Sequence, residues 1–294
     1  MTIDKPAVVV TGVSTGIGED AVRALIADGW FVFGSVRREE DAARLAERFG
    51  ADFAPLLFDV TDVEAIGRAA QEVERRLEGA TLAGLVNNAG VAFPGPLLHQ
   101  PLDEFRRQFE INLFGQLAVI QAFAPLLGAR AARREPPGRI VQMSSVAGSL
   151  ASPFLGAYAA SKFALEGFSD ALRRELMVFG IDVIILEPGV IRTAIWDKAE
   201  RADFDRYDAT VYGRGARKIQ AFAVEQGKNG PPPELVSNAI LRALKEKRPP
   251  ARIVVVARYF FDYLLPRLFP TRVLDWIIAR RYGFLQPMEA HHDR

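Results

Sequence analysis

The sequence predicts a single α/β domain in which a doubly wound parallel sheet of about seven strands carries helices on both faces. Short, nearly continuous apolar segments alternate with longer segments of helical periodicity, and apolar residues make up 49% of the chain. Parallel strands that are covered on both faces appear in a sequence as unbroken apolar runs. Strand–helix alternation along the chain implies right-handed crossovers, which produce this kind of sheet.

Strands are expected wherever Val, Ile, Leu and Phe follow one another with little polar interruption. In chain order these segments are AVVV (7–10), FVFGSV (31–36), FAPLLF (53–58), LAGLV (82–86), RIVQM (139–143), DVIIL (182–186) and RIVVV (252–256). Helical periodicity separates them at about residues 17–28, 40–49, 62–78, 103–130, 157–179 and 234–246. Neither a linker nor a repeat interrupts the series, so residues 1–294 are assigned to one domain.

Two segments depart from this alternation. Residues 190–230 are rich in Tyr, Phe, Arg and Gly, and a connection of this length is expected to form a substrate lid. Residues 257–294 form a C-terminal extension, expected to be helical, in which arginines alternate with aromatic residues. Such a segment could lie on a membrane surface. Closing the pocket or joining a neighbouring subunit is the favoured interpretation.

Composition limits the classes of function. The net charge of +1 gives no argument for a nucleic-acid partner. Without cysteine the chain has no disulfide, no thiol nucleophile and no zinc–thiolate site, and with three histidines we expect no metal. The start of the chain lacks the pattern of a secretory signal, and no apolar run of about 18 residues could span a membrane. A cytoplasmic protein is therefore expected.

A glycine-rich turn joins the first strand to the first helix, as in sheets of the Rossmann type. The segment TGVSTGIG holds Gly12, Gly16 and Gly18 in the spacing G-x-x-x-G-x-G. Such a turn lets backbone N–H groups approach a pyrophosphate, and the helix N-terminus favours the negative charge. Ser14, Thr15 and Ile17 belong to the same phosphate-binding turn. The alternative is a plain strand-to-helix turn.

The second strand ends in GSVRREE, where an acidic residue would favour NAD(H). Here Arg37 and Arg38 follow Ser35, and an arginine pair suits a phosphate dianion. NADP(H) is therefore preferred over NAD(H), although NAD(H) stays possible and the pair could simply be solvated. Asp59, with Val60 beside it, ends the third strand where an adenine edge could be recognised.

Six motifs, in this order along the chain, carry a family resemblance. They are TGVSTGIG, NNAG (87–90), Asn112, SS (144–145), YAASK (158–162) and PGVIRT (188–193). Together they resemble the short-chain dehydrogenase/reductase family, and residues 158–193 are similar to 17β-hydroxysteroid, retinol and hydroxybutyrate dehydrogenases. The resemblance implies an enzyme that interconverts an alcohol and a ketone. It also implies a homodimer or homotetramer that pairs through the helices at 103–130 and 157–179.

Tyr158 is the expected acid and base. A free phenol has a pKa near 10, and Lys162 lies on the same helical face four residues later. A cation roughly 5 Å away contributes about 3 kcal/mol at an effective dielectric constant of about 20, so it is expected to lower the phenol's pKa by about two units. Ser145, rather than the competing Ser144, is expected to hold the substrate oxygen.

The resemblance assigns the remaining roles. It implies that Lys162 binds the nicotinamide ribose and that Asn112 holds a water linking this lysine to solvent, the alternative being a satisfied buried asparagine. It implies that Thr193 binds the carboxamide while Ile191 packs against the nicotinamide ring. The other implied cofactor contacts are Asn87, Ala89, Gly90, Pro188, Gly189 and Val190.

The residues around the expected catalytic group are largely apolar. Expected substrate contacts are Phe93, Ser145, Phe154, Leu155 and Trp196. A lipophilic ketone or secondary alcohol, steroid-like or retinoid-like, is the favoured substrate. The aromatic lid could instead pack against its own domain, which would leave small carbonyls or 3-oxoacyl compounds as substrates. A cofactor-sensing protein without turnover is the alternative from another functional class.

Overall fold

The computed structural model describes residues 3–130, 136–200 and 203–285. Its sheet has seven strands in the order β3-β2-β1-β4-β5-β6-β7, and every neighbouring pair is parallel. The strands are β1 Ala7–Val10, β2 Phe31–Val36, β3 Phe53–Leu57, β4 Gly84–Asn87, β5 Arg139–Met143, β6 Asp182–Pro188 and β7 Arg252–Val255. The doubly wound sheet that the sequence predicts is confirmed.

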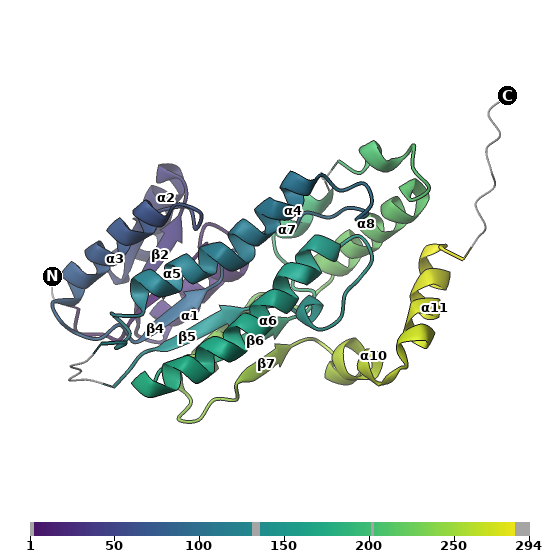
Figure 1. The fold of residues 1–294 in the computed structure, drawn as a ribbon. Coiled ribbons are helices and arrows are strands. Elements are labelled where there is room, and N and C mark those ends of the chain that lie inside the picture. Colours follow the sequence, from purple (N-terminus) through teal and green to yellow (C-terminus); the bar gives the residue numbers. More distant parts are fainter. Residues whose placement is uncertain (1–2, 131–135, 201–202, 286–294) are drawn as a thin grey trace.

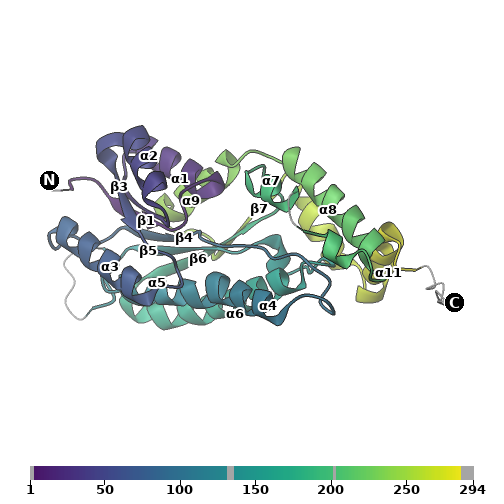
Figure 2. The ribbon, with the colours of Figure 1, turned by 90° about the horizontal axis from the view of Figure 1, so that it is seen from above.

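Helices cover both faces of the sheet. They are α1 Gly16–Ala27, α2 Glu39–Phe49, α3 Val63–Leu77, α4 Leu102–Phe109, α5 Gly115–Phe123, α6 Gly156–Leu176, α7 Ile195–Glu200, α8 Gly213–Lys228, α9 Glu234–Lys245, α10 Leu265–Leu268 and α11 Thr271–Tyr282. Figure 2 shows α1, α2 and α9 on one face and α3, α4, α5 and α6 on the other. No helix in the described ranges is long and apolar enough to cross a membrane.

Two hydrophobic cores lie on the two faces of the sheet because side chains alternate along each strand. Val9 belongs to the core beneath α3, α5 and α6, whereas Val8 and Val10 belong to the core beneath α1, α2 and α9. All three valines have no exposed surface. Both faces are thus buried, which explains the unbroken apolar runs in the sequence.

The expected helix at 103–130 is not continuous. Between α4 and α5 the chain forms a π-helical turn, Glu110–Phe114, and α5 ends at Phe123. Pro125 follows this end, and proline has no N–H for a helical hydrogen bond and clashes with the preceding turn. Gly128, with φ +106°, then reverses the chain toward β5. The helical periodicity of the sequence continues through the π-helical turn and past the end of α5, so it did not predict either break.

The segment expected as a lid contains two helices, α7 and α8, and a third, small core lies beneath it. Phe154, Phe204, Tyr207 and Ala216 are buried in that core. α10 and α11 lie beyond this end of the sheet (Figure 1), and α11 contacts α8. The last part of the predicted extension, 286–294, lies outside the described residues.

Candidate active site

The carboxyl ends of parallel strands meet at one edge of the sheet, where ligands bind in doubly wound folds. The glycine-rich turn after β1 lies there, and its backbone requires glycine. Gly12 and Gly16 have φ values of +69° and +66°. A Cβ on Gly12 would lie 2.9 Å from the Cα of Ala89, and a Cβ on Gly18 would lie 2.3 Å from the carbonyl oxygen of Gly12. The turn is therefore closed tightly against the segment after β4.

Polar side chains that the sequence-based site did not include hold this turn. The Thr11 hydroxyl accepts from the backbone N–H groups of Asn88 (3.0 Å) and Ala89 (2.9 Å). The Asn88 side chain donates to the carbonyl oxygens of Thr11 (2.9 Å) and Gly12 (3.1 Å). The Ser35 hydroxyl accepts from the backbone N–H of Gly12 at 3.0 Å. Thr11 and Asn88 lie within the motifs TGVSTGIG and NNAG, so the sequence did contain a signal that could have identified them.

The start of α1 has the properties of an anion site. Thr15 caps the helix in an extended conformation, yet its side chain makes no capping hydrogen bond. The first-turn N–H groups have no partner within the helix, and the helix dipole favours a negative group there. A Cβ on Gly16 would lie 3.3 Å from the Cβ of Thr193, so the segment after β6 reaches this turn. The residues present thus fit a dinucleotide phosphate.

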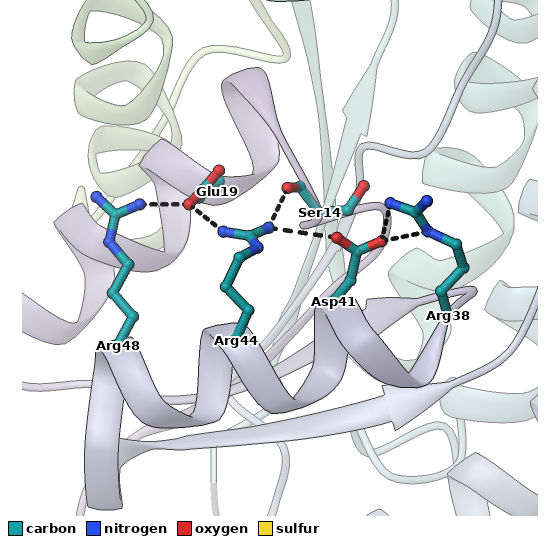
Figure 3. A network of polar contacts seen from close by, with 6 residues as sticks. All are labelled: Ser14, Glu19, Arg38, Asp41, Arg44 and Arg48. Atoms are coloured by element: carbon teal, nitrogen blue, oxygen red, sulfur yellow. Dashed lines mark hydrogen bonds and ion pairs between the residues drawn. The ribbon is translucent and has the colours of Figure 1, made fainter.

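An ionic network ties α2 to the outside of the turn (Figure 3). Arg44 donates to the Ser14 carbonyl oxygen at 2.6 Å and pairs with Glu19 at 3.0 Å and Asp41 at 3.5 Å. Arg38 also pairs with Asp41, at 2.8 Å. Sequence reasoning missed Arg44, because its contacts depend on how α2 packs beside α1.

Arg37 and Arg38, the two candidates for contacting a 2′-phosphate, differ in how closely they pair with carboxylates of the protein. Arg37 is 63% exposed, and its guanidinium approaches the Asp59 carboxylate only to 3.7 Å. The Asp59 carboxylate itself accepts from the backbone N–H and the hydroxyl of Thr61. Arg38 is held by two nitrogens against Asp41. Arg37 is therefore the arginine with more freedom to contact a ligand at the end of β2.

The structure brings together three of the four expected catalytic side chains. Ser145 follows β5, and its hydroxyl lies close enough to the phenol of Tyr158 on α6 to favour the charged form of that phenol. The Lys162 ammonium lies 5.8 Å from the centre of the Tyr158 ring and donates to the Met143 carbonyl oxygen at 2.7 Å. Lys162 is only 4% exposed. A phenol, an alcohol and a buried amine thus converge at the carboxyl edge of the sheet.

The expected effect of Lys162 on Tyr158 is wrong in this structure. Desolvation raises the pKa of Tyr158 above its ordinary value, and only the neighbouring Ser145 hydroxyl opposes the rise. Burial also lowers the pKa of Lys162 from 10.5 to about 8, against the opposing charge of Glu166. Removing both groups from water disfavours both charged forms, and this cost outweighs their mutual attraction. The sequence could show the spacing but not the burial.

Geometry also separates the two adjacent serines. The Ser145 hydroxyl donates to the Pro188 carbonyl oxygen at 3.3 Å and accepts from the Ala147 N–H at 3.1 Å, besides contacting Tyr158. The Ser144 hydroxyl is buried without a partner among the described residues. It faces Gly148, where a Cβ would lie 2.9 Å from its oxygen. Ser145 is thus the serine that faces the phenol.

Asn112 lies in the π-helical turn and is fully buried. Its carbonyl oxygen accepts from the Val91 N–H at 2.9 Å, and its amide donates to the Val91 carbonyl oxygen (3.0 Å) and the Ser161 hydroxyl (3.1 Å). Both N–H bonds of the side chain are thus used within the protein. These contacts favour the interpretation that Asn112 is a buried asparagine whose hydrogen bonds are made within the protein, over the one in which its side chain holds a water. Asn112 ties the segment after β4 to α6.

Asn87 also faces the interior. Its amide donates to the Gln142 side chain at 2.8 Å and to the Gln116 carbonyl oxygen at 3.4 Å, so it joins β4 to β5 and α5. Of the other residues expected to contact the cofactor, Val190 is exposed, whereas Gly189 donates its N–H to Val255 at 2.9 Å. The cofactor contacts of these residues stay predictions.

The expected substrate residues fall into two groups. Phe154 is buried, with its ring edge-on to Tyr212 and Phe284. The Trp196 indole donates to the Ile191 carbonyl oxygen at 2.7 Å and packs over Gly227 of α8. Both side chains therefore help to build the lid itself. The remaining apolar residues, Phe93 and Leu155, are half-buried.

Comparisons with known proteins identify the family. The family model for short chain dehydrogenases matches residues 6–203. An NADPH-dependent 3-dehydrocapnine reductase from Ornithobacterium rhinotracheale is 41% identical over 92% of this chain and 95% of its own length. Estradiol 17-beta-dehydrogenase 2 from Mus musculus is 30% identical over 96% of this chain and 76% of its own. The protein therefore belongs to the short-chain dehydrogenase family, a family of oxidoreductases, as its motifs predict.

A solved structure agrees. A short-chain dehydrogenase from Streptomyces avermitilis is 28% identical to this chain and superposes with a TM-score of 0.72. The superposition covers 97% of this chain and all of that one. The likeness thus extends over almost the whole chain.

Proposed function

We propose that this protein is an NADPH-dependent reductase that converts a lipophilic ketone into a secondary alcohol. The observation that carries the proposal is the buried Lys162 ammonium 5.8 Å from the centre of the Tyr158 ring, with the Ser145 hydroxyl beside the phenol. A cofactor-sensing protein would not require this group of three, so the arrangement favours an enzyme over a sensor.

The cofactor fits the residues present. The glycine turn and the start of α1 would hold the pyrophosphate, and Arg37 would contact a 2′-phosphate. Glycine is required at Gly12 and Gly18 by the packing of the protein itself, because a Cβ would collide with Ala89 or with the carbonyl oxygen of Gly12. The name of the bacterial relative, an NADPH-dependent reductase, supports NADP(H), with NAD(H) as the alternative. When bound, NADPH supplies the hydride.

The protein's own residues supply the proton. Because its pKa is raised, Tyr158 is protonated at neutral pH and can donate to a carbonyl oxygen that becomes an alkoxide. Ser145 would hold that oxygen through its hydroxyl. The Lys162 cation, present below about pH 8, would stabilise the phenolate left after donation. Reduction is the favoured direction, since oxidation would need Tyr158 to begin as a phenolate.

A lipophilic substrate remains the favoured class. Exposed Leu97 lies against Gly156 at the start of α6, between half-buried Leu155 and Tyr158 in the sequence, so apolar side chains are available near the phenol. The names of the two relatives are compatible with ketone or alcohol substrates. Small carbonyl and 3-oxoacyl compounds are the alternatives. Exposed Phe114 and Phe163, on the helices where the family resemblance places subunit pairing, support the expected homo-oligomer.

The test is NADPH oxidation with a panel of steroid, retinoid and aryl ketones, compared between the wild-type protein and Tyr158→Phe. Loss of the phenol should reduce kcat/KM by at least about a hundredfold, because general-acid catalysis contributes that much. NADPH affinity, followed by nucleotide fluorescence, should change little. Undiminished turnover in the variant would refute the proton-donating role. NADPH binding without turnover of any ketone would favour the sensor.

A further inference from the structure

The C-terminal extension, defined here as residues 257–285, is anchored on one side only. Arg267 of α10 donates to the Ser149 hydroxyl and approaches the buried Glu187 carboxylate to 3.9 Å. At the other end Phe284 contacts Phe154, with ring centres 5.7 Å apart. In both views α11 lies at the end of the molecule beyond α8 (Figures 1 and 2). The opposite side of the extension is left uncovered.

That uncovered side is unusually apolar. Phe261 is 60% exposed, Leu268 is 65% exposed and Trp276 is 50% exposed. Other exposed large apolar side chains in the extension are Tyr259, Phe260, Phe269, Val273, Ile277 and Leu285. Such a concentration of exposed apolar side chains within residues 257–285 is typical of a binding surface.

The same side is basic. On α11 the exposed residues Arg272, Val273, Trp276, Ile277 and Arg280 follow helical spacing and share one face. Within the described ranges neither arginine has a carboxylate within 4 Å. The Arg280 guanidinium instead lies 5.3 Å from the centre of the Trp276 ring. Unpaired arginines next to exposed aromatic residues suit a partner that has an apolar interior beneath an anionic surface.

We propose that the C-terminal extension is a peripheral docking surface for an anionic lipid bilayer. Trp276 and its apolar neighbours would enter the headgroup–acyl boundary, while Arg272 and Arg280 would contact lipid phosphates. A two-fold contact with a second copy fits less well. Such an interface is self-complementary, so it would bring this arginine-bearing face against itself. Because α11 contacts α8, docking would place the lid segment beside the lipid.

The experiment is co-sedimentation of the full-length protein with vesicles. One set contains 30% phosphatidylglycerol in phosphatidylcholine, and the other contains phosphatidylcholine alone. Binding to the anionic set is expected, with an affinity that falls at least about tenfold between low salt and 0.5 M salt, because surface charge is screened. The emission of Trp276 should shift to the blue on binding. In Trp276→Phe this shift should disappear while sedimentation persists.

Two variants test the face, and two control variants change similar side chains on other helices. Arg272→Glu/Arg280→Glu and Trp276→Ser should each weaken binding at least about tenfold. The matched controls are Arg68→Glu/Arg106→Glu, whose side chains are 68% and 66% exposed, and Met177→Ser, which is 72% exposed. Both controls should bind vesicles like the wild type. Thermal unfolding verifies that each variant is folded.

The outcomes are distinct. Loss of binding in the two extension variants, and in neither control, supports the proposal. It is overturned if the wild type fails to sediment, if neutral vesicles bind it equally, or if the controls lose as much binding as the extension variants. A concentration-dependent dimer in light scattering that Trp276→Ser abolishes, without vesicle binding, would assign the face to a second copy. None of these results depends on the proposed reaction.

Discussion

The side-chain amide of Asn88 donates to the carbonyl oxygen of Gly12 over 3.1 Å and so ties the first glycine of the turn to the segment after β4. The same amide donates to Thr11, and a Cβ on Gly18 would lie 2.7 Å from its nitrogen. One side chain therefore fixes the backbone on both sides of the proposed phosphate site. Its two N–H bonds donate to carbonyl oxygens, and a carboxylate, which has no N–H, could not make these hydrogen bonds.

Asn88→Asp should therefore disrupt the turn. A carboxylate facing two carbonyl oxygens loses both hydrogen bonds and adds repulsion, which is expected to lower the free energy of unfolding by about 1–3 kcal/mol. The Kd for NADPH should rise in parallel. Urea unfolding and nucleotide fluorescence measure the two effects. Asn238→Asp, on the exposed face of α9, makes the same chemical change away from the turn. If the two variants lose equal stability, the role assigned to Asn88 is wrong.

The two serines after β5 should behave differently. Ser145→Ala removes the hydroxyl that contacts Tyr158, and we expect kcat/KM for ketone reduction to fall by about 10²–10³. Ser144→Ala removes a buried hydroxyl that lacks a partner among the described residues, so turnover should stay within about threefold of the wild type. Steady-state NADPH oxidation compares them directly. A larger loss in Ser144→Ala would reverse the assignment.

Arg37 should decide the choice of cofactor. Arg37→Asp removes the charge that would contact a 2′-phosphate and introduces repulsion, so the Michaelis constant for NADPH should rise by about tenfold or more. The constant for NADH should change little. Arg38→Asp is the neighbouring comparison and should have the smaller effect, because Arg38 is already held by Asp41. Equal changes for the two nucleotides in Arg37→Asp would overturn the preference for NADP(H).

Burial of Lys162 predicts a pH dependence of stability. Its pKa is about 8 in the folded protein and near 10.5 when unfolded, so the unfolded chain binds more protons between these values. Stability should consequently rise with pH across this window, by up to about 3 kcal/mol relative to Lys162→Met. Below pH 8 the difference between the two proteins should be constant. Denaturant unfolding at pH 7, 8, 9 and 10 without nucleotide measures it, and parallel curves would contradict the buried cation.

The strand segments, the doubly wound sheet and the positions of the candidate catalytic residues could be predicted from the sequence because they depend on local pattern. Runs such as AVVV at 7–10 occur only where both faces of a strand are buried, and the motifs place Tyr158, Lys162 and Ser145 by spacing alone. The raised pKa of Tyr158 could not be predicted, since it depends on desolvation by distant segments. The same holds for Arg44, whose contacts join two helices. The break at Pro125 was visible, but the strong periodicity on its N-terminal side outweighed it.

The strand order also separates two tasks in space. The residues proposed to discriminate between nucleotides follow β1, β2 and β3, in one half of the sheet, whereas the lid segment and the extension follow β6 and β7 in the other. The chain crosses from one half to the other once, between β3 and β4. Coenzyme preference and substrate range can therefore diverge separately in evolution. A chimera that grafts everything after Thr193 from a relative should shift the substrate range toward the donor's and retain the recipient's choice of nucleotide.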